Sequence, residues 1–195
     1  RDIQTQCVAI GDGLNYEKYS CNPVLDKNDP PEGGSAADFR DPKVWREVDG
    51  TFYCVIGNRT PDGSGTILLY QSADGLKWNY VRTLDACHNQ YGKMWECPDL
   101  FPLDGQQVLL TSPQEMYPIG LEFHAGNNAL CLLGDWDPQS KEFRRQAVQA
   151  VDYGLDFYAP QTLLTPDGRR IMIAWMQNWA TAGAKPAHCR WFGQM

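Results

Sequence analysis

The segment Cys97-Pro98-Asp99-Leu100-Phe101, which leads to the turn Asp104-Gly105, carries the pattern that decides the fold. A proline begins a short apolar stretch, and an Asp-Gly pair follows six or seven residues later. The same order occurs on both sides of it, in Asp41-Pro42-Lys43-Val44-Trp45 with Asp49-Gly50 and in Ala159-Pro160-Gln161-Thr162-Leu163 with Asp167-Gly168. The Asp-Gly pairs lie 55 and 63 residues apart, and periods of this size in a strand-rich sequence are typical of β-propeller blades.

Short runs rich in β-branched and aromatic residues recur between these repeats, bounded by glycine, proline and aspartate. No segment has a long apolar stripe of helical period. The runs are Thr51–Ile56, Thr66–Tyr70, Gln107–Leu110, Ala129–Leu133 and Arg170–Trp175. The turn Ser72–Trp78 suits the connection between the two outer strands of one blade. We therefore predict an all-β chain that forms part of a propeller; the alternative is a β-sandwich whose hairpins resemble each other by chance.

The composition excludes several classes of protein. The chain has 195 residues, 43% of them hydrophobic and 21% charged, with a formal net charge of -7. It therefore has enough apolar residues for a core, and its acidic balance argues against nucleic acid and anionic membranes as partners. Seven scattered cysteines without a C-x-x-C pair argue against a disulfide framework and favour a cytoplasmic protein. The three histidines lack metal-ligand spacing, so neither a metal nor a cofactor is expected.

Two carboxylates stand where the repeats begin. The innermost strand of a propeller blade faces the central channel, so its first residues rim one mouth of that channel. Asp41 and Glu96 occupy near-equivalent positions in the first and second repeats and are expected to converge there. Paired carboxylates are the minimum apparatus for cleaving a glycosidic bond, provided that one is held protonated while its partner is ionised.

Two motifs give this pattern a family resemblance. Phe39–Trp45 resembles the R-D-P motif of glycoside hydrolase family 32, and Met94–Phe101 resembles its E-C motif in the form W-E-C-P-D-L-F. Further stretches similar to the family are Gln4–Ala9, Asn15–Tyr19, Asn22–Val24, Asp152–Gln161 and Arg190–Met195. The resemblance thus runs from end to end of the chain.

The family has a five-bladed propeller followed by a β-sandwich, and it hydrolyses terminal β-D-fructofuranosides with retention of configuration. By this resemblance, residues 1–195 are an incomplete catalytic propeller domain, with no second domain. They comprise the end of blade two, blades three and four, and the start of blade five.

The resemblance also implies roles for individual residues. Glu96 is the expected general acid/base, and Asp41 is expected to hold fructose hydroxyls and stabilise the transition state. Arg40 is expected to keep Asp41 ionised and to contact the sugar, with Cys97 tuning the surroundings of the acid. Weaker candidates for sugar contacts are Asp156, Tyr158 and Trp175. Asp156 could equally be a structural cap, and most of the aromatic rings are expected to lie in the core.

One family motif has no counterpart in this sequence. The nucleophile of the family is an aspartate in a W-M-N-D-P-N-G motif, which does not occur among these 195 residues. We therefore expect that the chain alone does not turn over sucrose. The unpaired sheet edges of a partial propeller also favour self-association.

The leading functional hypothesis is hydrolysis of sucrose or sucrose 6-phosphate, with a small carbohydrate as the partner molecule. Inulin or levan hydrolases and fructosyltransferases of the same family remain alternatives. A different class of function is a non-catalytic, fructan-binding propeller that uses the two acids for hydrogen bonding. Arabinanases of a neighbouring five-bladed family are a further alternative, but they lack the cysteine that here follows Glu96.

Overall fold

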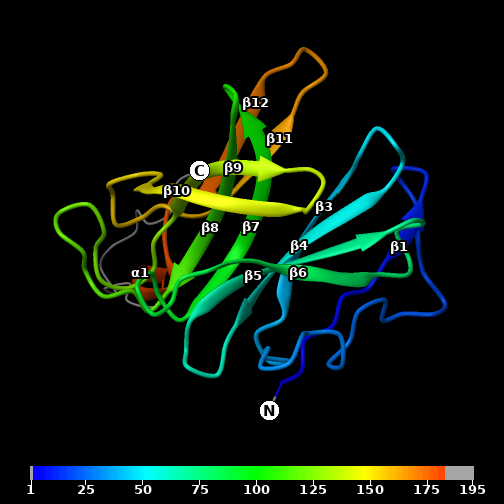
Figure 1. Cartoon of the computed structure of the whole chain (residues 1–195), viewed down its shortest axis with the longest axis horizontal. Helices are drawn as coiled ribbons and strands as arrows, with labels where there is room; N and C mark the ends of the chain where they lie inside the picture. Colours follow the sequence, from blue (N-terminus) through cyan, green and yellow to red (C-terminus); the bar gives the residue numbers. More distant parts are fainter. Residues whose placement is uncertain (1, 183–195) are drawn as a thin grey trace.

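The computed structural model describes residues 2–182, which are almost entirely strands and turns (Figure 1). The strands are β1 (Ala9–Gly11), β2 (Tyr16–Lys18), β3 (Arg40–Arg46), β4 (Phe52–Arg59), β5 (Gly65–Ser72), β6 (Asn79–Ala86), β7 (Met94–Leu103), β8 (Gln106–Gln114), β9 (Leu130–Asp137), β10 (Glu142–Ala150), β11 (Tyr158–Leu164) and β12 (Arg170–Trp175). One helical turn, α1 (Trp179–Ala182), follows them. The stretch Arg190–Met195 and His188 lie outside the described residues.

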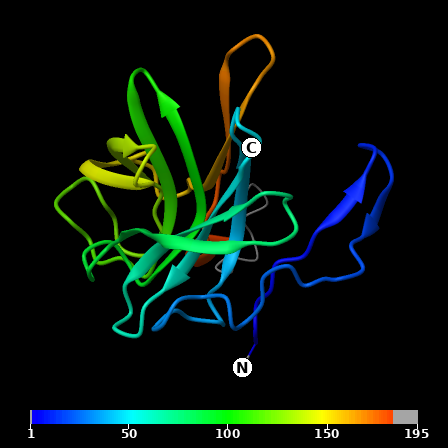
Figure 2. The same cartoon turned by 45° about the vertical axis from the view of Figure 1, so that its right-hand side comes forward.

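The strands form two four-stranded antiparallel sheets and two hairpins. The sheets have the orders β3-β4-β5-β6 and β7-β8-β9-β10, so each strand pairs with the next one along the chain. The hairpin β1-β2 precedes them and stands apart in Figure 2, and the hairpin β11-β12 follows. The arrangement is the end of one propeller blade, two whole blades and the start of another. It confirms the prediction of an all-β, partial propeller.

The turns follow from the Asp-Gly pairs that mark the repeats. Asp104 and Gly105 have φ angles of 48° and 81° and join Leu103 to Gln106 in a two-residue hairpin. Both angles are positive, as a type I′ turn requires. Gly50 and Gly168 also have positive φ angles, of 92° and 85°. The glycine of each pair therefore supplies a backbone conformation that other residues adopt at a cost.

A shared core joins the two complete blades. It contains Val55 and Leu69 from the first blade and Trp95, Leu109 and Leu132 from the second. Every one of these five side chains is fully buried. Such burial contributes on the order of 1.5–3 kcal/mol for each large aliphatic side chain. The beginning of β7, which carries Glu96, is thus held firmly against the preceding blade.

Two glycines allow this close approach. A Cβ atom on Gly65 would lie 2.3 Å from Cδ1 of Trp95, and one on Gly57 would lie 2.1 Å from the carbonyl oxygen of Trp95. Either methyl group would push β7 away from β4 and β5. The indole Nε1 of Trp95 donates a hydrogen bond of 2.7 Å to the carbonyl oxygen of Tyr91. The residue before Glu96 is therefore fixed by both packing and hydrogen bonding.

A lysine ties the three innermost strands together. Lys43 of β3 donates from Nζ to Oδ2 of Asp99 on β7 at 3.3 Å. The same nitrogen donates to Oε1 of Gln161 at 3.2 Å and to the carbonyl oxygen of Thr162 at 2.7 Å, both on β11. The inner strands of successive blades are thus neighbours.

Within residues 2–182, no helix has the length and apolar character needed to cross a bilayer.

Candidate active site

Each of the three innermost strands begins with the same local distortion. The residue before the repeat's proline has a positive φ angle although it is not glycine. These residues are Asp41 at 62°, Cys97 at 50° and Ala159 at 54°. The pairing register also shifts there, between Arg40 and Lys43, between Glu96 and Asp99, and between Tyr158 and Gln161. Such bulges aim side chains away from the regular alternation of a strand, and each strained residue costs about 1–3 kcal/mol.

The three bulges lie at equivalent positions, in agreement with the alignment of the repeats. Asp41 corresponds in position to Cys97, and Glu96 corresponds to Arg40 and, in the third strand, to Tyr158. The two carboxylates are therefore offset by one residue between neighbouring blades. The offset places the carboxylate of Asp41 against the backbone next to Glu96, as described below.

The carboxylate of Glu96 is buried and has three donors around it. Oε1 accepts a hydrogen bond of 2.7 Å from Nε of Arg40. Oε2 accepts one of 2.7 Å from the hydroxyl of Tyr158 and one of 2.9 Å from Nε2 of Gln114. The residue as a whole is only 8% exposed. The donors come from β3, β8 and β11, which belong to three successive blades. Together they hold this one side chain in a fixed orientation.

Tyr158 has a different position from the one expected. We expected a sugar contact, but the residue is 1% exposed and its hydroxyl lies against Glu96. The same hydroxyl lies 3.1 Å from the carbonyl oxygen of Ser112, a second acceptor for its hydrogen. Burial and then the neighbouring Glu96 carboxylate raise the pKa of Tyr158, so the phenol remains a hydrogen-bond donor. Tyr158 therefore holds Glu96 by a hydrogen bond, and its contact with a sugar stays a prediction.

Arg40 also differs from expectation in its partner. Its guanidinium contacts Glu96, Oδ1 of Asp38 at 3.1 Å and Oε1 of Gln114 at 3.4 Å, rather than Asp41. Burial by itself lowers the pKa of Arg40, but the charges and hydrogen bonds of Glu96 and Asp38 outweigh it and raise that pKa. The arginine therefore compensates the negative charge of Glu96 and Asp38.

Asp41 lies against the backbone of the E-C motif. Its Oδ2 accepts a hydrogen bond of 3.0 Å from the backbone nitrogen of Cys97, and the thiol of Cys97 lies 3.6 Å from the same oxygen. Burial, followed by the charges of Asp41 and Glu96, raises the pKa of the Cys97 thiol. Cys97 is thus a neutral donor to Asp41, and its expected influence on Glu96 stays a prediction.

Two polar residues of this cluster were not predicted from the sequence. Gln114, the last residue of β8, contacts both Glu96 and Arg40. Asp38, just before β3, accepts hydrogen bonds from Arg40 and from Oγ of Ser35 at 3.0 Å. Counting across the hairpin turn Asp104-Gly105 without the bulge would have placed Gln114 opposite Trp95, one residue from its observed partner Met94 and next to Glu96.

The remaining candidates lie around this cluster. Trp175, at the end of β12, pairs in register with Tyr158, and its ring centroid lies 5.2 Å from that of Trp179. Asp156 is half-buried in the loop two residues before Tyr158. Asp99 is not beside Glu96: its Oδ2 accepts 2.7 Å hydrogen bonds from the backbone nitrogen and the hydroxyl of Thr162. It joins β7 to β11, the innermost strands of two successive blades. Among residues 2–182, no group of His, Cys, Asp and Glu side chains has the arrangement of a metal site.

Comparison with known proteins identifies the class and then the family. A β-propeller with a buried glutamate and a neighbouring aspartate at one mouth has the arrangement of a glycosidase site, and the model that matches residues 1–195 is the glycosyl hydrolases family 32 N-terminal domain. The chain belongs to glycoside hydrolase family 32. This finding confirms the family resemblance carried by the R-D-P and E-C motifs.

Curated proteins that are similar in sequence support the family assignment. The chain is 42% identical over 179 residues to a raffinose invertase of Escherichia coli, a match that covers 90% of this chain and 36% of the relative. It is 39% identical over 176 residues to a sucrose-6-phosphate hydrolase of Bacillus subtilis, covering 88% of this chain and 35% of that protein. The chain thus spans about a third of the length of these relatives.

Solved structures give the same result. The β-fructofuranosidase of Bombyx mori superposes with a TM-score of 0.82 at 40% sequence identity, over 90% of this chain and 37% of that one. A variant of the same enzyme has been solved in complex with sucrose and superposes equally well. The sucrose-6-phosphate hydrolase of Lactobacillus gasseri superposes with a TM-score of 0.75 at 28% identity, over 91% and 36% of the two chains.

Proposed function

We propose that the full-length protein hydrolyses terminal β-D-fructofuranosides such as sucrose or sucrose 6-phosphate, with retention of configuration. The observation that carries the proposal is the buried Glu96 carboxylate, oriented by Arg40 and Tyr158 beside Asp41. A glycosidase needs an acid fixed next to the leaving oxygen and a second carboxylate that stabilises the developing positive charge. The names of the relatives, invertase and sucrose-6-phosphate hydrolase, support this choice of substrate.

Glu96 is the general acid/base of this mechanism. It gives its proton to the leaving glycosyl oxygen in the first step and takes a proton from water in the second. All three neighbours donate hydrogen bonds to its carboxylate, an arrangement that suits the ionised form of the second step. The protonated form fits when the Tyr158 hydroxyl turns to the carbonyl oxygen of Ser112, 3.1 Å away. Oε2 can then carry the proton.

Asp41 stabilises the oxocarbenium-like transition state. Its Oδ2 is held by the backbone nitrogen and the thiol of Cys97. No residue in 2–182 forms a hydrogen bond with its Oδ1, which leaves that oxygen for hydroxyls of the fructose ring. A carboxylate fixed in advance needs little reorganisation as positive charge develops on the sugar.

The mechanism needs a third carboxylate as nucleophile. In a retaining glycosidase, a carboxylate attacks the anomeric carbon and forms a glycosyl-enzyme intermediate that water then hydrolyses. The family resemblance assigns this step to an aspartate whose motif is not in the present sequence. We propose that residues 1–195 are one part of the catalytic propeller and that the full-length protein supplies the nucleophile.

A cleavage assay with stereochemical readout tests the proposal. The full-length protein is incubated with sucrose, sucrose 6-phosphate and inulin, with methanol added as a competing acceptor. Release of fructose together with methyl β-D-fructofuranoside is the expected result, since retention preserves the β configuration. The α-methyl product would exclude the double displacement. Binding of a fructan without any cleavage would instead establish the carbohydrate-binding alternative.

A further inference from the structure

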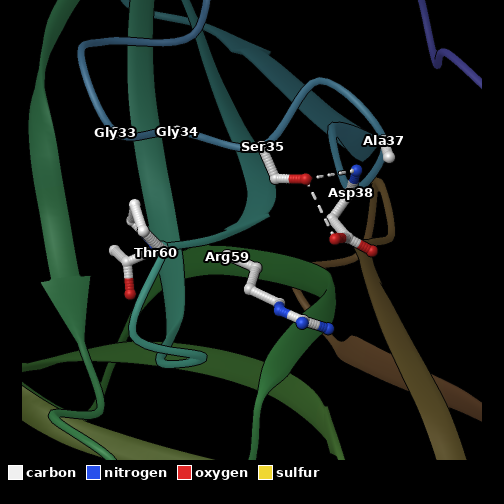
Figure 3. A pocket seen from close by; sticks show the side chains of 8 residues that line it. Gly33, Gly34, Ser35, Ala37, Asp38, Arg59 and Thr60 are labelled. Atoms are coloured by element: carbon white, nitrogen blue, oxygen red, sulfur yellow. Dashed lines mark hydrogen bonds between the residues drawn. The ribbon is translucent and has the colours of Figure 1, made fainter.

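A pocket of about 320 Å³ lies next to the Glu96 cluster, between the segment that precedes β3 and the end of β4. Figure 3 shows Ser35 and Asp38 on one side of it and the side chain of Arg59 extending into it. Thr60 and the backbone of Gly33 and Gly34 complete the wall. We call this space the Arg59 pocket.

The Arg59 pocket is connected to the proposed acid by one side chain. Arg40 donates from Nε to Glu96 and from Nη1 to Asp38, which lines the pocket. Asp41, the proposed partner of the fructose ring, is bonded instead to the backbone of β7. The pocket therefore lies on the side of Glu96 where Asp38 and the end of the middle strand β4 are found. Because the acid protonates the oxygen between the two sugars, the leaving group occupies a space next to Glu96 and apart from the fructose ring.

The polar side chains of the pocket differ in whether they already have hydrogen-bond or ion-pair partners within the protein. Asp38 accepts hydrogen bonds from Arg40 and Ser35, so its charge is compensated. The Thr60 hydroxyl is bonded to Asp62 and to the carbonyl oxygen of Ser64. No carboxylate in residues 2–182 forms an ion pair with Arg59. Its guanidinium is thus a charged donor without an anion in the described part of the chain.

We propose that the Arg59 pocket receives the leaving part of the substrate and that Arg59 binds an anionic substituent on it, specifically a phosphate monoester. A guanidinium is always charged and presents paired N–H groups that match two oxygens of a phosphate. The half-buried setting of Arg59 limits competition by water. The proposal rests on the proposed function for the position of the leaving group, and it gives this site a preference for phosphorylated over neutral sucrose.

Binding of the phosphorylated product tests the pocket independently of turnover. The full-length protein is titrated calorimetrically with glucose 6-phosphate and with glucose, as wild type and as the variants Arg59→Gln, Arg59→Lys and Arg169→Gln. Arg59→Gln is expected to weaken glucose 6-phosphate binding by about 10- to 100-fold, and Arg59→Lys by less, because one charged donor remains. Arg169 lies exposed in the β11-β12 turn, paired with Asp167, so its variant is the matched control and should bind as wild type does.

The outcomes separate this proposal from the proposed function. An unchanged affinity of Arg59→Gln for glucose 6-phosphate, or an equal loss for glucose, overturns the phosphate assignment even if sucrose is cleaved. A selective loss of glucose 6-phosphate binding in a protein that cleaves no fructoside supports the anion site and overturns the proposed hydrolase function. In an active protein, the ratio of kcat/KM for sucrose 6-phosphate to that for sucrose should fall by the same 10- to 100-fold in Arg59→Gln.

Discussion

Tyr158 lies with its hydroxyl 2.7 Å from Oε2 of Glu96, although 62 residues separate the two in the sequence. Both residues lie near the start of innermost strands, at equivalent bulges, and the contact brings successive blades together at one carboxylate. Burial raises the pKa of Tyr158, so its hydroxyl remains protonated well into the alkaline range. The tyrosine consequently keeps its proton and remains a hydrogen-bond donor, and we expect it to contribute to catalysis by orienting Glu96.

Replacing Tyr158 with phenylalanine should separate orientation from sugar binding. We expect kcat to fall by about 10-fold, since Oε2 of Glu96 loses one of its two donors, while KM stays within about twofold. Steady-state kinetics with sucrose on the full-length protein provide both parameters. A large rise in KM with an unchanged kcat would instead support the direct sugar contact expected from the sequence.

Glu96→Gln removes the proposed proton donor and keeps the shape of the side chain. Turnover of sucrose should fall by about 10²–10⁴-fold, the usual contribution of a general acid. A 4-nitrophenyl β-fructofuranoside, whose leaving group needs no proton, should show a much smaller loss in its first step. Melting temperatures check that the fold is intact. Near-wild-type rates on sucrose would exclude Glu96 as the acid.

Asp41→Asn tests the role of the second carboxylate in the transition state. The amide can still hydrogen-bond to fructose hydroxyls but cannot compensate positive charge on the sugar ring. We therefore expect kcat to fall by at least about 100-fold with a much smaller change in KM. An effect confined to KM would assign Asp41 to substrate binding alone.

The middle strands of the blades could be predicted from the sequence because buried strands have a continuous run of apolar residues. The middle strands β4 and β5 are buried along almost their whole length, and both were anticipated. The outer strands β6 and β10 expose many of their side chains, so their sequences lack the apolar runs by which strands were recognised. Their positions follow only from the need to complete each four-stranded sheet.

The sequence predicted which residues lie at the site better than it predicted which of them contact each other. The motifs pointed to Asp41 and Glu96, but not to the bulges at which both side chains leave the regular alternation of their strands. Each of these bulges has a positive φ angle at a residue other than glycine, for which the sequence has no strong signal. The burial of Tyr158 also depends on strands from the preceding blade, which local sequence cannot reveal. For this reason, Arg40 and Tyr158 were assigned to Asp41 and to the sugar rather than to Glu96.

The reactivity of Cys97 provides a test of its electrostatic surroundings. Its thiol pKa is raised by burial and by two carboxylates, so less thiolate is present at any given pH. At about pH 8.5, alkylation of Cys97 by iodoacetamide should be at least about 10-fold slower than that of the exposed Cys7 and Cys21. Peptide mass spectrometry over a time course measures all three rates.

Asp41→Asn provides the comparison for this reactivity. Loss of one negative charge near the sulfur should accelerate labelling of Cys97, while Cys7 and Cys21 react as before. Equal rates at all three cysteines of the wild-type protein would show that Cys97 is not held as a half-buried neutral thiol.

Asp99→Ala should destabilise the propeller without removing a catalytic group. The substitution leaves two buried donors of Thr162 without their acceptor and removes the one anionic acceptor among the three that residues 2–182 offer the Lys43 ammonium, at a cost of about 3 kcal/mol. The melting temperature of the full-length protein should fall by several degrees. Asp135→Ala is the control, because Asp135 is exposed and accepts one surface hydrogen bond from Gln146. Well below the melting temperature, Asp99→Ala should keep kcat within a few-fold of wild type, since Asp99 joins β7 to β11 and does not contact Glu96; a loss of several orders of magnitude there would place Asp99 in the catalytic machinery.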